Sequence, residues 1–98
     1  MTINKNKEDN VLTISLTGRL DTVTAPELEA ELEKSLDNST EVFFDFAELE
    51  YISSAGLRVI LAAQKVMNTQ GKMIIKNVNE TISEVFEVTG FSDILTIE

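Results

Sequence analysis

The sequence predicts an α/β fold in which a mixed sheet of four to five strands carries helices mainly on one face. Three observations lead to this fold class. Strand-like and helix-like segments alternate along most of the chain, which favours parallel strands joined by right-handed crossovers. Only a short polar turn separates the first two strand-like segments, so they are expected to form an antiparallel hairpin. The second and third strands alternate apolar with polar residues, as expected where one face of the sheet stays partly open.

Five segments have the pattern of strands. They are residues 2–6, 11–17, 41–46, 72–76 and 94–97. The second, VLTISLT, places Leu12, Ile14 and Leu16 on one face and Val11, Thr13 and Ser15 on the other, and Gly18 punctuates it. The third, EVFFDF, directs most of its apolar side chains to one side, and a loop is expected to follow it over residues 47–53. The first and last segments are expected at the edges of the sheet.

The first helix is expected to begin near Thr24 and to end near residues 37–39. Thr24 and Glu27 have the spacing of a capping box, in which each side chain satisfies a free backbone donor of the other. Pro26 lies in the first turn, where its missing N–H costs nothing. Leucines then recur every fourth residue, which predicts one apolar stripe.

Two more helices are expected in the second half of the chain. One runs from Ser54 to about Thr69, and Gly71 gives it a C-terminal stop. The last begins after Asn79, which can serve as its N-cap, and ends at Gly90. With 98 residues, the chain is expected to form one domain over residues 1–98.

Composition excludes several classes of function. The net charge of −9 disfavours nucleic acid and anionic membrane surfaces as ligands, and it suits a basic protein partner as well as simple solubility. The sequence has no cysteine and no histidine, so thiol chemistry, the usual metal ligands and the usual general base are missing. We therefore expect no enzyme, no cofactor and no metal site. The absence of a signal segment or membrane span in the sequence predicts a cytoplasmic protein, and we expect a monomer.

The most informative segment is residues 45–61, DFAELEYISSAGLRVIL, which passes from a strand into a helix. Ser53 and Ser54 stand where this helix begins, and the simplest interpretation is that a serine caps it. A second interpretation uses the same geometry, because a helix N-terminus also stabilises an attached phosphate. The small residues Ala55 and Gly56 would then keep the helix start low enough for a partner to approach.

Asp21 follows the second strand and precedes the first helix. If the second and third strands are parallel neighbours, Asp21 and the Ser54 region meet at the carboxyl edge of the sheet. Asp21 could orient the Ser54 hydroxyl or contact a partner. It could equally be a turn residue that accepts hydrogen bonds from its own backbone.

At these residues the chain resembles the STAS family, and within it the bacterial anti-sigma-factor antagonists. Two blocks carry the resemblance, LTGRLDTVTAPEL over residues 16–28 and DFAELEYISSAGLRVIL over residues 45–61. The second block is similar to the family's phosphoacceptor segment. In many members an aspartate precedes the phosphoserine, and Ser53 stands in that place here.

The resemblance implies a partner-switching cycle. The unphosphorylated protein binds an anti-sigma factor, which is usually also its serine kinase, and the sigma factor is released. The kinase phosphorylates the serine that falls on Ser54 here, with Ser53 as second choice, and a PP2C-type phosphatase reverses the step. The expected partner surface consists of Asp21, Thr22, Ser53, Ser54, Ala55, Gly56, Arg58, Ala62 and Lys65.

One alternative remains open at this point. The same fold could serve as a constitutive scaffold in a signalling or lipid-transport complex, without phosphorylation of its own. An enzyme is the weakest class, since it would depend on Asp21 or Asp45 as a lone acid.

Overall fold

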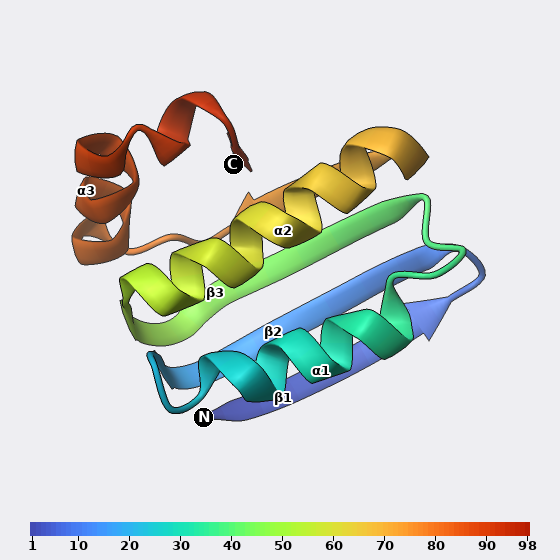
Figure 1. Ribbon diagram of the computed structural model, residues 1–98, viewed down its shortest axis with the longest axis horizontal. Helices are drawn as coiled ribbons and strands as arrows, with labels where there is room; N and C mark the ends of the chain where they lie inside the picture. Colours follow the sequence, from blue (N-terminus) through green and yellow to red (C-terminus); the bar gives the residue numbers. More distant parts are fainter.

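The computed structural model describes all residues from Met1 to Glu98, which form one five-stranded sheet with helices packed against it (Figure 1). The strands are β1 (Thr2–Glu8), β2 (Val11–Leu20), β3 (Glu41–Ile52), β4 (Lys72–Lys76) and β5 (Thr96–Ile97). The helices are α1 (Ala25–Ser35), α2 (Ser54–Gln70) and α3 (Glu80–Thr89), with a short 3₁₀ turn at Phe91–Asp93. Strands β1 and β2 are antiparallel and all other neighbours are parallel, which confirms the predicted fold class.

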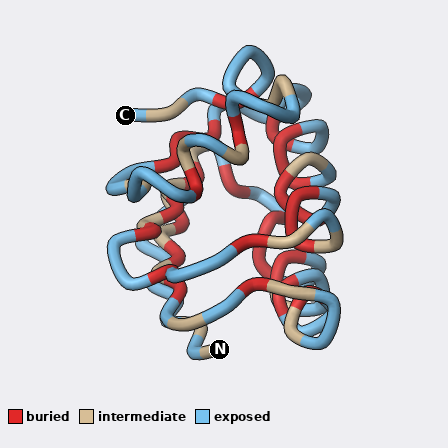
Figure 2. Tube along the Cα trace, turned by 90° about the vertical axis from the view of Figure 1, so that its left-hand side faces the viewer, coloured by how far each residue is buried: buried red, intermediate tan, exposed pale blue.

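The strand order explains why the helices share one face. The strands lie in the order β1-β2-β3-β4-β5. Each parallel crossover therefore joins a strand to its immediate neighbour, and all of them advance across the sheet in the same direction. Because crossovers of this kind are right-handed, helices that connect a sheet wound in one direction lie on the same side of it. Figure 1 shows α1 and α2 side by side in front of the sheet, and Figure 2 shows the sheet and helix layers edge-on.

The core lies between these two layers. It contains 23 buried apolar residues, and most of the buried segments in Figure 2 face one another across the gap between sheet and helices. Phe44 and Phe46 are fully buried at its centre, with their ring centroids 5.9 Å apart in an edge-to-face arrangement. On the opposite face of β3, Phe43 is only partly buried and lies beneath the Lys76 ammonium.

Strands β2 and β3 extend further than the sequence predicted. Gly18 does not end β2 but lies inside it with φ of +99°, and the loop expected over residues 47–53 is mostly strand. The pairing of β2 with β3 contains two register shifts. They change the spacing of buried residues in β3 from every second to every third, namely Phe46, Leu49 and Ile52. Bulged strands lose their regular alternation in this way, which is why the sequence pattern resembled a loop.

The predicted helix ends are confirmed for α2, where Gly71 is the C-cap, and for α3, and one prediction differs for α1. Asn79 caps α3 by accepting a hydrogen bond from the Ile82 N–H at 2.8 Å, and Gly90 ends that helix in the left-handed region at φ of +81°. The capping box predicted for α1 is wrong. The Thr24 hydroxyl makes no cap hydrogen bond and instead donates to the Arg19 carbonyl at 2.8 Å.

Two lysines of β1 fasten α1 to the edge of the sheet. Lys5 forms an ion pair with Glu31 in the middle of the helix. The Lys7 ammonium donates to the carbonyl oxygen of Ser35 at 3.3 Å, in the last turn of α1, and to that of Asp37 at 2.9 Å, just beyond the helix. The start of α1 is therefore held by the β2–α1 loop and its end by β1.

Candidate functional site

The carboxyl ends of β2 and β3 meet at one edge of the sheet, as the sequence predicted. Leu20 is paired with Ile52, and the Ser53 N–H donates to the Leu20 carbonyl at 2.9 Å. The β2–α1 loop and the first turn of α2 are thus joined directly. Side chains from both segments share this edge, where sites in sheets of this kind are usually found.

Ser53 and Ser54 have different roles at the start of α2. Ser53 is the N-cap, with extended backbone, and its hydroxyl oxygen accepts a hydrogen bond from the Gly56 N–H at 3.4 Å. It is partly buried. Ser54 is the first residue of the helix, is exposed, and its hydroxyl forms no hydrogen bond within the chain. The capping role expected for serine therefore belongs to Ser53, and Ser54 has a free hydroxyl.

Gly56 is buried inside the first turn of α2 and does not belong to the exposed surface. A Cβ atom at this position would lie 2.7 Å from Leu20 Cγ and 3.0 Å from Ile52 Cγ1. The glycine allows α2 to approach the end of β2. The lack of a side chain at Gly56 thus serves packing within the molecule, and its contact with a partner stays a prediction.

Asp21 closes the β2–α1 loop on itself. Its Oδ1 accepts hydrogen bonds from the N–H of Val23 at 3.0 Å and from the N–H of Thr24 at 3.1 Å. The Thr24 N–H is the main reason why the pKa of the Asp21 carboxyl lies below its usual value. Asp21 makes no hydrogen bond to Ser54 and acts as a turn residue within the chain, and its contact with a partner stays a prediction.

Arg19 and Tyr51 form a second pair at this edge that sequence reasoning missed. They are neighbours across β2 and β3, and the Arg19 guanidinium carbon lies 4.3 Å from the centroid of the Tyr51 ring. Arg19 Nε also lies 3.7 Å from Asp21 Oδ2. The side chains of Arg19 and Tyr51 are exposed, as is that of Val23 in the adjoining loop. The edge therefore presents aromatic and apolar surface as well as charge.

A shallow hollow of about 190 Å³ lies between the first turns of α1 and α2. Thr22, Ala55 and Arg58, all predicted as partner residues, line it. Its four other lining residues were not predicted for the site, and these are Ala25, Pro26, Glu29 and Val59. The hollow lies beside the exposed Ser54, so a protein that covered Ser54 would also meet its rim.

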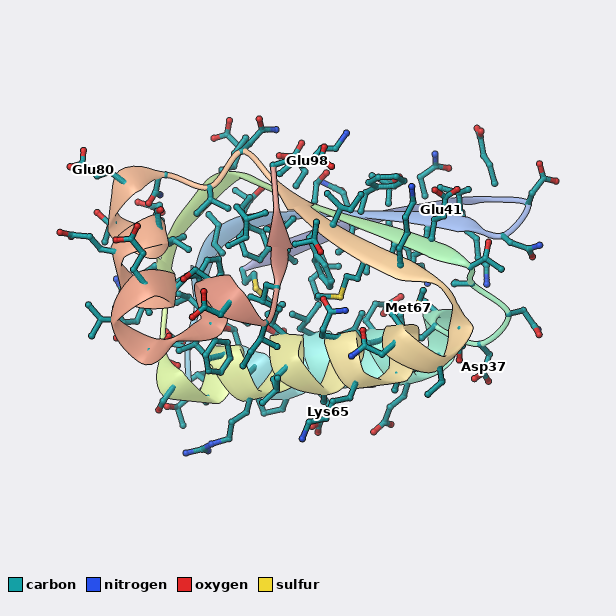
Figure 3. All side chains as sticks on the ribbon, turned by 90° about the horizontal axis from the view of Figure 1, so that it is seen from above. Asp37, Glu41, Lys65, Met67, Glu80 and Glu98 are labelled. Carbon is teal, nitrogen blue, oxygen red and sulfur yellow. The ribbon has the colours of Figure 1, made fainter.

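A second hollow of about 220 Å³ continues along the two helices and shares Glu29 and Val59 with the first. It contains the exposed Ala62. Lys65 is exposed but lines neither hollow, and Figure 3 shows it on the outer side of α2, away from the sheet. Of the predicted residues, Thr22, Ala55, Arg58 and Ala62 thus line the two hollows, and Lys65 lies outside them.

No group of three or more acidic, histidine or cysteine side chains is placed to hold a metal ion. No helix combines the length and apolar character that a membrane crossing requires.

Comparison with known proteins identifies the family. The model of the STAS domain matches residues 2–98. The chain belongs to the STAS domain family. It is 36% identical over 99 aligned positions to BtrV of Bordetella bronchiseptica, which carries the name of an anti-sigma factor antagonist, with 99% of this chain and 85% of BtrV covered. It is 27% identical to the anti-sigma-B factor antagonist of Staphylococcus aureus, with 99% and 92% covered.

Solved structures support the same fold for this STAS protein. The anti-sigma factor antagonist SpoIIAA in its unphosphorylated form superposes with a TM-score of 0.79 at 19% identity, covering 99% of this chain and 87% of SpoIIAA. The phosphorylated form of SpoIIAA from Bacillus gives a TM-score of 0.77 at 19% identity, with 99% and 91% covered. At these identities the likeness concerns the fold.

Proposed function

We propose that this STAS protein is a cytoplasmic anti-sigma factor antagonist that is switched off by phosphorylation of Ser54. Its unphosphorylated form binds an anti-sigma factor and thereby releases the sigma factor. The anti-sigma factor acts as the serine kinase, and a PP2C-type phosphatase regenerates the binding form. Three relatives carry the name of antagonist, and one of them, SpoIIAA, exists in an unphosphorylated and a phosphorylated form.

The observation that carries the proposal is the free hydroxyl of Ser54 at the first position of α2. Ser53 is partly buried and its oxygen is occupied as the N-cap, so the exposed neighbour is the better substrate for a kinase. In the reaction, the γ-phosphoryl group of ATP is transferred to Ser54 Oγ, the hydroxyl proton leaves, and ADP departs.

The added phosphate acts mainly on the docking surface. At the N-terminus of α2 it is stabilised by the helix dipole, so the fold tolerates it. It adds about −1.5 to −2 charges beside the hollow between α1 and α2. A partner that packs closely over Ser54 then meets a hydrated dianion that it must desolvate. Docking of the partner weakens for this reason while the protein stays folded.

The test uses each serine-kinase anti-sigma factor encoded in the same genome. Incubation with the cognate kinase and ATP is expected to add one phosphate, which peptide mapping by mass spectrometry locates on Ser54. Ser54→Ala should bind the anti-sigma factor like the parent and remain unmodified, and Ser54→Asp should bind more weakly. Ser53→Ala is the matched control and should still accept phosphate.

Two results would contradict the proposal. One is phosphate found on another residue. The other is equal affinity of the anti-sigma factor for the phosphorylated and unphosphorylated chains, which would favour a constitutive scaffold.

A further inference from the structure

Arg58 is an unpaired cation one helical turn beyond Ser54. It is exposed on α2 and takes part in none of the ion pairs of the structure. The other arginine, Arg19, is already engaged by Asp21 and by the ring of Tyr51. A guanidinium without a partner is therefore available close to the serine that we propose as the phosphorylation site.

The helix brings the two side chains toward each other. Residues four apart lie on the same face of a helix, with about 5–6 Å between their Cβ atoms. Helical side chains also lean toward the N-terminus, so the Arg58 side chain leans toward the turn that begins with Ser54. An acidic group placed before a basic one at this spacing is the favourable order. A planar guanidinium can bind a phosphate through two parallel hydrogen bonds.

In the unmodified chain Arg58 lines the hollow between α1 and α2, together with Thr22, Ala55 and Glu29. Glu29 has no ion-pair partner either, so the hollow presents one cation and one anion to an approaching protein. If Arg58 turned toward Ser54, the hollow would keep the anion and lose the cation. Phosphorylation of Ser54 would in this way change the charge of the hollow, which the phosphate itself does not occupy.

We propose that Arg58 responds to phosphorylation of Ser54. The Arg58 guanidinium leaves the hollow and forms an ion pair with the phosphate on Ser54. This inference rests on the proposed function only for the identity of the modified residue. It adds a second consequence of phosphorylation, because the charge of the docking hollow changes as well as that of Ser54. Arg58 does not take part in phosphoryl transfer. Its role is to change the charge of the docking hollow when it pairs with the phosphate.

The test needs neither kinase nor partner. Phosphoserine is incorporated at position 54 during translation, in the parent chain, in Arg58→Gln and in Lys34→Gln. Lys34→Gln is the control because it removes the same charge from an exposed position in the last turn of α1. The second pKa of the phosphate is measured by ³¹P NMR titration at low salt. The other charged groups of this edge, Asp21, Arg19 and Glu29, are the same in all three proteins.

An ion pair with Arg58 stabilises the dianion and lowers this pKa. The expected difference between the parent and Arg58→Gln is about 0.3–0.5 units, a two- to threefold change in the acid constant, given helix ion-pair strengths and a doubly charged partner. The control Lys34→Gln should stay within about 0.1 unit of the parent, since screening weakens distant charges.

An equal phosphate pKa in the parent and in Arg58→Gln would overturn the inference, and so would an equal shift in the control. Neither result would touch the proposed function, which is judged by the phosphorylation and binding experiments above. Conversely, a kinase that modified another serine would sink the proposed function and leave this measurement of the ion pair unchanged.

Discussion

Replacing Gly56 by alanine tests how closely α2 must approach β2. The new Cβ would lie 2.7 Å from Leu20 Cγ, 3.0 Å from Ile52 Cγ1 and 3.0 Å from the Leu20 carbonyl oxygen. Ordinary contacts between carbon atoms are about 3.5–4.0 Å, so the overlap is close to 1 Å. Because one of these atoms belongs to the backbone, the helix itself must shift.

Two opposing effects set the change in the free energy of unfolding that Gly56→Ala causes. Overpacking a close contact costs about 1–3 kcal/mol. Alanine in place of glycine within a helix stabilises it by about 1 kcal/mol. Gly56 has no positive φ that would require glycine. We expect a net loss of about 1 kcal/mol in the free energy of unfolding, which lowers Tm by about 4–8 °C for a chain of this size.

The assay is urea and thermal unfolding followed by circular dichroism. Ala62→Gly, at an exposed position of the same helix, is the companion variant, because it reports the alanine–glycine difference of α2 without a steric clash. Amide exchange at Ser53 should also accelerate in Gly56→Ala, since its N–H donates to the Leu20 carbonyl. A Gly56→Ala protein with a higher Tm than the parent would refute the reasoning.

Three further predictions concern single side chains. Asn79→Ala should cost about 1–2 kcal/mol by removing the cap of α3, and Asn79→Asp should recover part of this, because it keeps the acceptor for Ile82 but loses the donor to the Leu49 carbonyl. The pKa of the Asp21 carboxyl is lowered in the folded chain, so its contribution to stability is present above its ordinary value of 3.8 and disappears as the pH falls toward the folded pKa. Urea unfolding at pH 5 and pH 3 should therefore show a smaller loss for Asp21→Asn than for the parent. Gln64→Met should stabilise the protein by about 1 kcal/mol in thermal unfolding, because the buried Gln64 Oε1 has no hydrogen-bond donor.

Each of these expectations has a contrary outcome. Equal stability of Asn79→Ala and the parent would show that the cap is dispensable. Identical acid sensitivity of Asp21→Asn and the parent would assign the loss to other carboxylates with lowered pKa, such as Glu31 and Asp45. A less stable Gln64→Met would mean that the hydrogen bond from Gln64 to Asn68 outweighs the unpaired oxygen.

Much of the fold could be predicted because local patterns agree with the global arrangement. Alternation of apolar residues, the cap at Asn79 and the stop at Gly90 each depend on a few neighbouring residues, and the structure confirms them. The extension of β3 could not be predicted, because it depends on bulges in its pairing with β2. A bulge shows in the sequence only as an interruption of the alternation, which resembles a loop.

The bulges also explain why the pair of Arg19 and Tyr51 could not be predicted from the sequence. Ser15 pairs with Asp45, an offset of 30 residues, but Arg19 pairs with Tyr51, an offset of 32. Without the two extra residues in β3, Arg19 would lie beside Leu49 and not beside the tyrosine. The Gly56 contact was also beyond local reasoning, because it depends on the distance between α2 and Leu20.

The order of the strands has a consequence for how the chain assembles. Every strand lies beside the one that precedes it in the sequence, so no segment has to be inserted between two that have already paired. During synthesis each newly emerged helix and strand can add to an existing edge, and each addition closes only a short stretch of chain. The strand that adds after β4, namely β5, pairs only two residues with it.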